Sequence, residues 1–123
     1  MDISQSIAEL KRRPGFAEKV GMVLVHNGVV RARSRKDGRL VAALEVAPDL
    51  EAIEAIRGDC LTRSGIFEIV IEARAGRFMP GDDLLFIIVA GDLREHVKPV
   101  LAEVLDRVKG GPIAKREILA EEA

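Results

Sequence analysis

The sequence feature that most constrains the fold is an uninterrupted run of seven apolar residues at 84–90 (LLFIIVA). A short run of this composition is typical of a β-strand whose two faces are both covered. A membrane-spanning helix needs about 20 apolar residues, so the run does not indicate a transmembrane segment. The tetrad at 79–82 (MPGD) directly before it predicts a turn. We therefore expect a turn followed by a fully buried strand.

Strand patterns also occur over four other segments: 21–32, 40–46, 66–73 and 112–119. Asp37-Gly38 is a strong turn signal between the first two of these, which predicts that they pair as a hairpin with a basic, mobile loop. The third alternates apolar and charged residues, with Glu68 and Glu72 on one face. That alternation predicts a half-exposed strand with both carboxylates in solvent.

Three segments have the apolar spacing of amphipathic helices. The first is short and ends before Pro14-Gly15. The second follows Asp49, which predicts an N-cap, and we expect it to stop near Gly65. The third carries its apolar residues on one face, namely Val97, Val100, Leu101, Val104, Leu105 and Val108.

The start of the third helix carries two conflicting signals. Asp92 and Glu95 stand three apart, as the members of a capping pair do. Pro99 lacks a backbone N–H and predicts either a kink or a helix that starts close to it. The whole order is α-β-β-α-β-β-α-β, which predicts an α+β fold with a largely antiparallel sheet and flanking helices. At 123 residues, the chain (1–123) is expected to be one domain.

Composition excludes several classes of function. Nineteen basic residues nearly balance twenty acidic ones and aromatic residues make up only 3%, which argues against a dedicated nucleic-acid binder. A single cysteine, Cys60, excludes a disulfide framework and is interpreted as a packed small hydrophobe. His26 and His96 are too few for a histidine-rich metal site and are interpreted as ordinary surface or core residues. No metal or cofactor is expected, and the absence of a signal peptide predicts a cytoplasmic protein.

Cationic residues recur where regular elements end: Arg31, Arg94, Lys109, Lys115 and Arg116. Taken singly, each is typical of a solvated surface charge, and Lys109 can simply complement the C-terminus of its helix. As a set they would suit a phosphorylated ligand, because Arg gives bidentate contacts and Lys a movable point charge. Position in the sequence does not decide between these interpretations.

Three ordered blocks of sequence carry a resemblance to a known family. The first is 21–45, which includes GMVLVHNGVVR and ends in Leu44-Glu45; the second is GRFMPGDDLLFIIVAGDLR at 76–94. The third is the helix that ends at Lys109, followed by GPIAKRE at 111–117. The ordered set resembles the large catalytic subunit of molybdopterin synthase, and the resemblance implies an α/β-hammerhead type of fold.

The resemblance also implies an activity and its partners. The family transfers sulfur from the thiocarboxylated Gly-Gly end of a small ubiquitin-like subunit to cyclic pyranopterin monophosphate, which forms the dithiolene of molybdopterin. Its large subunits form a homodimer with one small subunit at each end, a heterotetramer. By position, Lys109 and Lys115 would be catalytic, and Arg31, Arg94 and Arg116 would bind the substrate. Gly110-Gly111 is internal, so the chain would be the acceptor of sulfur and not its carrier.

Three departures from the family pattern support a rival hypothesis. Leu93 stands where the family has His, Ala114 where it has Trp, and the interval from Lys109 to Lys115 is one residue shorter than usual. The alternative is a diverged, non-catalytic relative that binds an anionic ligand or a protein tail. Nucleic-acid binding through the basic segment 31–36 (RARSRK) is a weaker hypothesis, because such loops on neutral proteins are usually just solvated.

Overall fold

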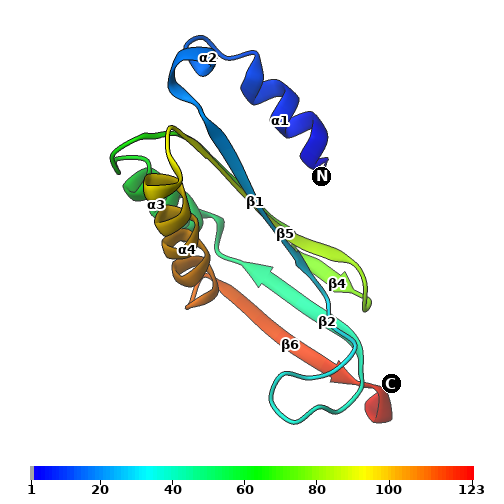
Figure 1. Ribbon diagram of the computed structural model, residues 1–123. Helices are drawn as coiled ribbons and strands as arrows, with labels where there is room; N and C mark the ends of the chain where they lie inside the picture. The colour runs from blue at the N-terminus through cyan, green and yellow to red at the C-terminus, as the bar shows by residue number, and fades with distance from the viewer. Residues whose placement is uncertain (1) are drawn as a thin grey trace.

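The computed structural model describes residues 2–123, which form two three-stranded antiparallel sheets with helices packed on the first (Figure 1). The elements in chain order are α1 (Ile3–Lys11), α2 (Phe16–Lys19), β1 (Met22–Val29), β2 (Val41–Pro48), α3 (Leu50–Cys60), β3 (Ile66–Ala73), β4 (Gly76–Phe78), β5 (Asp83–Gly91), α4 (Arg94–Lys109), β6 (Ile113–Leu119) and the 3-10 turn η1 (Ala120–Glu122). The predicted α+β class and antiparallel pairing are confirmed. Elements α2, β4 and η1 add to the predicted order.

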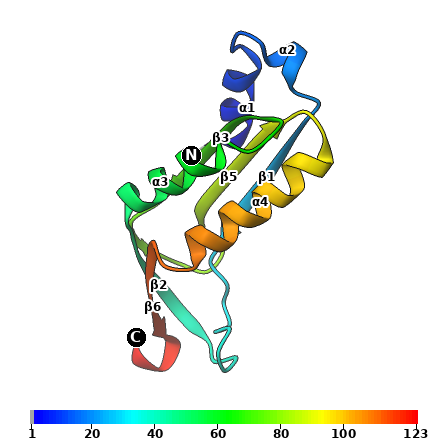
Figure 2. The ribbon, with the colours of Figure 1, turned by 90° about the vertical axis from the view of Figure 1, so that its left-hand side faces the viewer.

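The apolar run at 84–90 is the middle strand of the first sheet, whose order is β1-β5-β3. Every residue of β5 after Asp83 is buried, as its sequence predicted. Helices α3 and α4 cover one face of this sheet, and α1 lies over the other (Figure 2). Ile87 and Val89 belong to the core under α3 and α4, whereas Ile88 and Ala90 pack toward α1. The apolar composition of β5 is thus explained by cover on both sides.

The second sheet has the order β4-β2-β6 and extends away from the helices (Figure 1). The predicted hairpin between the first two strands is wrong, because β1 pairs with β5 and β2 pairs with β6 and β4. Only one isolated bridge, between Arg33 and Leu40, joins the segment after β1 to the start of β2. The Asp37-Gly38 signal is local and correctly marks a turn, but strand pairing depends on strands that are distant in the sequence: the apolar β5 for β1, and β6 for β2.

Glu68 corrects the prediction of an exposed carboxylate face on β3. Its side chain is 9% exposed, and the strand has a register shift between Ile66 and Glu68. Because β3 is an edge strand, arginines from both sides of the sheet reach the carboxylate. Arg57 of α3 donates to Oε1 at 2.6 Å, and Arg13 after α1 pairs with Oε2. Such an inward charge on an edge strand also guards that edge against pairing with another chain.

The helix ends partly confirm the prediction. Asp49 is the N-cap of α3 and accepts a hydrogen bond from the backbone N–H of Ala52 at 3.1 Å. The predicted capping by Asp92 is wrong, since Leu93 occupies the N-cap of α4 and makes no side-chain cap. Pro99 lies inside α4, which begins at Arg94 and continues to Lys109. Across residues 2–123, no helix has the length and apolar content that crossing a bilayer requires.

Candidate anion-binding site

A cavity of about 850 Å³ opens where the end of β1, the loop after it, the end of α4 and strand β6 meet. Eight cationic side chains line it: Arg31, Arg33, Arg35, Lys36, Arg39, Lys109, Lys115 and Arg116. Two of them are paired, because Arg39 contacts Asp37 and Glu121, and Arg116 contacts Glu45. Within the described part of the chain, no carboxylate lies within 4.0 Å of the other six. We call this cavity the cationic cavity.

Lys109 and Lys115 reach the cationic cavity from consecutive elements. Lys109 is the last residue of α4, and Gly110-Gly111 lead the chain into β6, where Lys115 lies opposite Val46 of β2. The shortened interval between the two lysines therefore does not separate them. Partial desolvation of the ammonium, with the positive charges of Lys109 and Arg35, lowers the pKa of Lys115 from its ordinary value. A bound anion would relieve this repulsion.

Arg31 is positioned by the turn that precedes β5. The backbone N–H of Val30 donates to the carbonyl of Asp82 at 2.9 Å, and the N–H of Gly81 donates back to the carbonyl of Val30 at 2.8 Å. Gly81 has a φ of 95°, which a residue with a side chain rarely adopts. The predicted turn at 79–82 thus fixes the place where β1 ends and Arg31 enters the cationic cavity.

The loop after β1 supplies the cations that sequence reasoning left in solvent. Ser34, 5% exposed, holds this loop against β6, because its hydroxyl donates to Glu117 Oε1 at 2.9 Å. Its backbone N–H donates to the carbonyl of Arg39 at 2.8 Å, which closes the loop. Arg35 and Lys36 are thereby brought to the cavity wall. The basic segment 31–36 was visible in the sequence, but contacts with β6 decide that this loop lies against the cavity.

Two of the predicted substrate-binding residues are not among the six cations of the cavity that lack a nearby carboxylate. Arg116 borders the cavity, but its guanidinium pairs with Glu45 Oε1 at 3.5 Å and its side chain is 75% exposed. Arg94 lies at the first residue of α4, and Lys109 lies at the last. At 1.5 Å per residue, the two are separated by roughly 22 Å along the helix axis. Within one chain, Arg94 is therefore remote from the cationic cavity.

His26 is a neighbour of the two lysines that sequence reasoning missed. Its burial and the positive charges of Lys109 and Lys115 lower the pKa of this histidine from its ordinary value. It shares one face of β1 with Gly28 and Val30, since side chains on a strand alternate. That alternation was the signal available in the sequence, but the approach of α4 and β6 to this face was not visible there.

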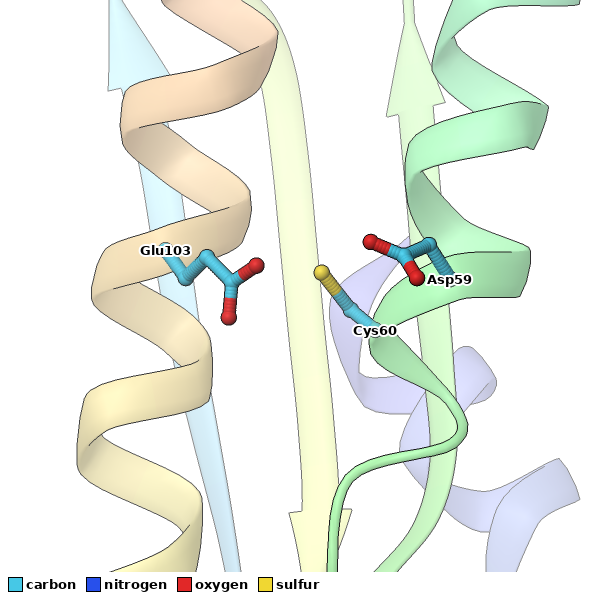
Figure 3. A group of neighbouring side chains, drawn as sticks. All are labelled: Asp59, Cys60 and Glu103. Carbon is cyan, nitrogen blue, oxygen red and sulfur yellow. The ribbon is translucent and has the colours of Figure 1, made fainter.

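A second cluster, made by Asp59, Cys60 and Glu103, offers three ligand atoms within 4.8 Å of one another (Figure 3). Its carboxylates are already engaged by two arginines. Arg107 contacts Asp59 at 2.6 Å and Glu103 at 3.0 Å, and Arg63 contacts Glu103 at 2.8 Å. Burial raises the pKa of the Cys60 thiol, which disfavours a thiolate ligand. The cluster is an ion-pair network that joins α3 to α4, and Cys60 is fully buried, as predicted.

Two departures from the family pattern lie outside the cationic cavity. Leu93 is exposed at the N-terminal end of α4. Ala114 lines a separate hollow of about 610 Å³ with Ala47, Gly76 and Arg77. Within a single chain, Leu93 lies at the end of α4 opposite to Lys109, whereas Ala114 adjoins Lys115, which also lines this hollow.

The fold and the cavity together define a small α+β protein with a cationic cavity between a helix end and two sheets. Comparison with protein families then gives the particular group. A family model described as MoaE protein matches residues 1–111, and the chain belongs to this family. A comparison with curated proteins gives no match.

Solved structures of similar proteins agree in fold. Molybdopterin synthase from Staphylococcus aureus is 21% identical with a TM-score of 0.78, over 98% of this chain and 87% of that one. Molybdopterin cofactor biosynthesis protein E from Burkholderia multivorans is 26% identical with a TM-score of 0.76, over 100% of this chain and 87% of that one. A complex of subunits 1 and 2 of molybdopterin-converting factor from Helicobacter pylori contains a chain 16% identical with a TM-score of 0.59, over 98% and 86%.

Proposed function

We propose that this chain is the large subunit of a molybdopterin synthase. Membership of the MoaE family, with likeness to molybdopterin synthase structures, supports a role in molybdenum cofactor biosynthesis as a subunit of a biosynthetic enzyme. The finer proposal is that it accepts sulfur from the thiocarboxylated end of a small ubiquitin-like subunit and installs it in cyclic pyranopterin monophosphate. The product is the dithiolene of molybdopterin.

The observation that carries this proposal is the cationic cavity. Eight cationic residues line it beside three acidic ones, Asp37, Glu117 and Glu122, and in the described chain no carboxylate lies within 4.0 Å of six of the eight cations. The cyclic phosphate of the substrate, which is a phosphodiester, and a thiocarboxylate are both anions, and both must be held together while oxygen is replaced by sulfur. Fixed positive charges stabilise such a pair and the negative charge that develops on the leaving oxygen. A cavity of about 850 Å³ has the size of ordinary small-molecule sites.

We assign roles by position in the cavity. Lys109 and Lys115 would contact the reacting sulfur and oxygen, because they stand together at the junction of α4 and β6. Arg31 would hold the substrate phosphate, since a guanidinium gives bidentate contacts to phosphate oxygens. Arg94 can belong to the same site only if a second copy of the chain brings it there. The proposed homodimer would satisfy that condition, and Arg116 would guide the substrate from the rim.

The proposed partner is the small subunit whose Gly-Gly end carries sulfur. The relative from Helicobacter pylori is described as a complex of two subunits of molybdopterin-converting factor, which supports a two-subunit assembly here. The extended C-terminus of such a partner would bring one carboxylate-like charge to the cavity, and Lys36 and Arg35 at the loop would attract it.

The test is a reconstitution of the reaction. The purified chain is mixed with a thiocarboxylated small subunit and cyclic pyranopterin monophosphate, and dithiolene formation is measured. Lys109→Ala should lower the rate by about a hundredfold or more, because one preorganised charge is lost. Lys98→Ala, an exposed lysine of the same helix, is the matched control and should keep the wild-type rate. No product from the wild type with a cognate partner would overturn the proposal.

The alternative function is binding without sulfur transfer. Leu93 and Ala114 favour it, because each replaces a residue that the family pattern would supply to substrate or partner. In this case the wild type would bind inorganic phosphate through Lys109 and Lys115 but would form no dithiolene. Isothermal titration with phosphate, run beside the reconstitution, separates binding from catalysis.

A further inference from the structure

Strand β1 has one edge without a hydrogen-bonding partner. It is an outer strand of the first sheet, whose order is β1-β5-β3. Across residues 2–123, the backbone of 22–29 bonds to β5, and no backbone bond from a turn or loop reaches it. A strand of eight residues with an open edge is a template on which another strand can pair. We call this side of the strand the open edge of β1.

In the part of the chain that the structure describes, the other three edge strands each carry a protection that β1 lacks. Edge strands are usually kept from pairing with other chains by charged side chains or by short length. Strand β3 carries Glu68 and Glu72, β6 carries three consecutive charges at 115–117, and β4 has only three residues. The sequence of β1 (MVLVHNGV) contains no Asp, Glu, Lys, Arg or Pro. This contrast favours an assembly in which the open edge of β1 is covered.

Exposed apolar side chains accompany the open edge of β1. Val25 is 37% exposed and Val29 is 50% exposed, and both lie on the same face as Val23, because side chains alternate along a strand. Val23 belongs to the core under α1, but Val25 and Val29 extend beyond it. A second copy of the chain offers a matching strand, since two uncharged edges meet without the like-charge repulsion that two copies of β3 or β6 would create.

Pairing of two such edges about a twofold axis is antiparallel and joins the two first sheets into one. The start of β1 in one copy then lies beside the end of β1 in the other. At its start, β1 borders the segment that leads into α4, because the N–H of Gly21 donates to the carbonyl of Gly91 at 2.8 Å. At its end, Gly28 and Val29 line the cationic cavity. Antiparallel pairing therefore brings the beginning of α4 in one copy toward the cationic cavity of the other.

The lengths of α4 and β1 make this exchange fit. Helix α4 packs against β1 (Figure 2), and Arg94 and Lys109 are separated by roughly 22 Å along the helix axis. From Met22 to Val29, β1 extends about 23 Å at 3.3 Å per residue. Because antiparallel pairing reverses one copy relative to the other, the displacement along β1 offsets the displacement along α4. Arg94 of the partner subunit then lies at the level of Lys109.

We propose that two copies of this chain pair antiparallel through the open edge of β1, and that this pairing adds Arg94 of the partner subunit to the cationic cavity. The guanidinium supplies bidentate donors to an anion that Lys109 and Lys115 also contact. The role of Arg94 in the reaction rests on the proposed function, whereas the pairing through β1 does not.

The first test is the mass of the whole protein in solution, measured by light scattering during gel filtration. The wild type should have twice the chain mass of 13.4 kDa at micromolar concentration. Val25→Lys puts a charge on each of the two edges and should raise the dissociation constant of the dimer by about a hundredfold or more. Leu50→Lys, at an exposed apolar position of α3, is the matched control and should stay dimeric. A monomeric wild type, or a folded Val25→Lys as dimeric as the control, would overturn the proposal.

Chemical cross-linking keeps the proposal testable if Val25→Lys does not fold. A twofold axis near the middle of β1 sets position 25 of one copy close to position 25 of the other. Val25→Cys should therefore be joined between copies by a short bismaleimide, whereas Leu50→Cys should not. Cys60 does not compete for the reagent, because it is buried. Absence of the link between the two copies at position 25, judged by peptide mass spectrometry, would contradict the pairing.

A mixture of two damaged variants tests whether Arg94 acts in the other copy. Arg94→Ala and Lys109→Ala each damage both sites of their own dimers. After subunit exchange, a mixed dimer has one site with both residues, because Lys109 comes from one chain and Arg94 from the other. Half of the dimers are then mixed, so the mixture should regain about a quarter of the wild-type rate of dithiolene formation.

The possible failures of these tests are distinguishable. No recovery of the rate, with mixed dimers present by native mass spectrometry, would overturn the assignment of Arg94. If the wild type itself makes no dithiolene, the proposed function fails, and the mass and the cross-link still judge the pairing through β1.

Discussion

The carboxylate of Glu68 provides a sharp test of how the layers are held together. It accepts hydrogen bonds from Arg57 at 2.6 Å and from the backbone N–H of Ile69 at 2.8 Å, and it also pairs with Arg13. Burial would by itself raise the pKa of this carboxyl, but these three donors hold it below its ordinary value of 4.5. Glu68→Gln removes the charge and keeps the shape.

The expected loss follows from the partners of the carboxylate. Glutamine has one carbonyl oxygen, so it can still accept from Arg57 and from the Ile69 N–H, but it turns its NH2 toward Arg13 and loses that contact. A hydrogen bond to a charged group contributes about 1.5–3 kcal/mol and a neutral one about 0.5–1.5 kcal/mol, so removing the carboxylate charge beside Arg57 costs about 1 kcal/mol. Arg13 is half exposed, so its share is discounted for screening. Arg57 keeps its bonds to the carbonyl of Ile69 and to Glu54 and is not stranded. We expect a loss of about 1–2 kcal/mol in the free energy of unfolding.

The assay is thermal unfolding followed by circular dichroism between pH 7 and pH 3. With an unfolding entropy of about 2.1 cal/mol/K per residue, 1 kcal/mol shifts the melting temperature of a chain of this length by about 4 °C. Glu68→Gln should therefore melt about 4–8 °C lower at pH 7. Since the folded-state pKa is depressed, the advantage of the wild type is complete above 4.5 and is lost as the pH falls through the folded value.

The matched control is Glu72→Gln, on the same strand, which should stay within about 0.5 kcal/mol of the wild type because no ion pair to Glu72 occurs in the described chain. The expected shift is about 4–8 °C. A melting temperature for Glu68→Gln within about 1 °C of the wild type at pH 7 would therefore refute the reasoning. So would a difference that persists unchanged at pH 3, because protonation of Glu68 should erase it.

Four further predictions concern other parts of the molecule. Because its pKa is lowered, Lys115 should be acetylated faster than the exposed Lys98 near neutral pH, with phosphate protecting it, as peptide mass spectrometry would show. Gly58→Ala should raise stability by about 0.5–1 kcal/mol, because this helical position has open space around it. Gly65→Ala should lower stability by more than about 1 kcal/mol, because φ is +76° and the new Cβ would lie 2.2 Å from a carboxylate oxygen just before α4. The free energies of unfolding of the two glycine variants are measured by urea unfolding. Cys60, buried and with a raised pKa, should react with a thiol reagent only after denaturation.

The departures from the family pattern have different structural meanings. The short link between Lys109 and Lys115 leaves both lysines in one cavity, and Ala114 changes a second hollow that Lys115 also lines. Leu93 lies at the far end of α4 with Arg94. Leu93 can therefore affect the proposed reaction only if a second copy of the chain brings this end of α4 to the cavity. The reconstitution tests the proposed reaction and the proposed homodimer together.

The sequence by itself determined the eight longer elements, because each is encoded by local periodicity, whereas α2, β4 and η1 were too short to be predicted. The apolar run at 84–90 required cover on both faces, Asp49 capped its helix, and the Pro80-Gly81 turn placed the start of β5. Even Cys60 was correctly interpreted as buried from its place beside an apolar helical face. The order of elements therefore predicted the α+β class.

Only the tertiary structure decided which elements meet. The Asp37-Gly38 signal predicted a hairpin, but β1 pairs with β5 and β2 pairs with β6 in separate sheets. Glu68 was assigned to solvent because no local rule shows that arginines from two layers reach one edge strand. The loop cations became part of the cationic cavity for the same reason. A side chain's environment is set by residues far away in the sequence, and single-chain periodicity carries no information about them.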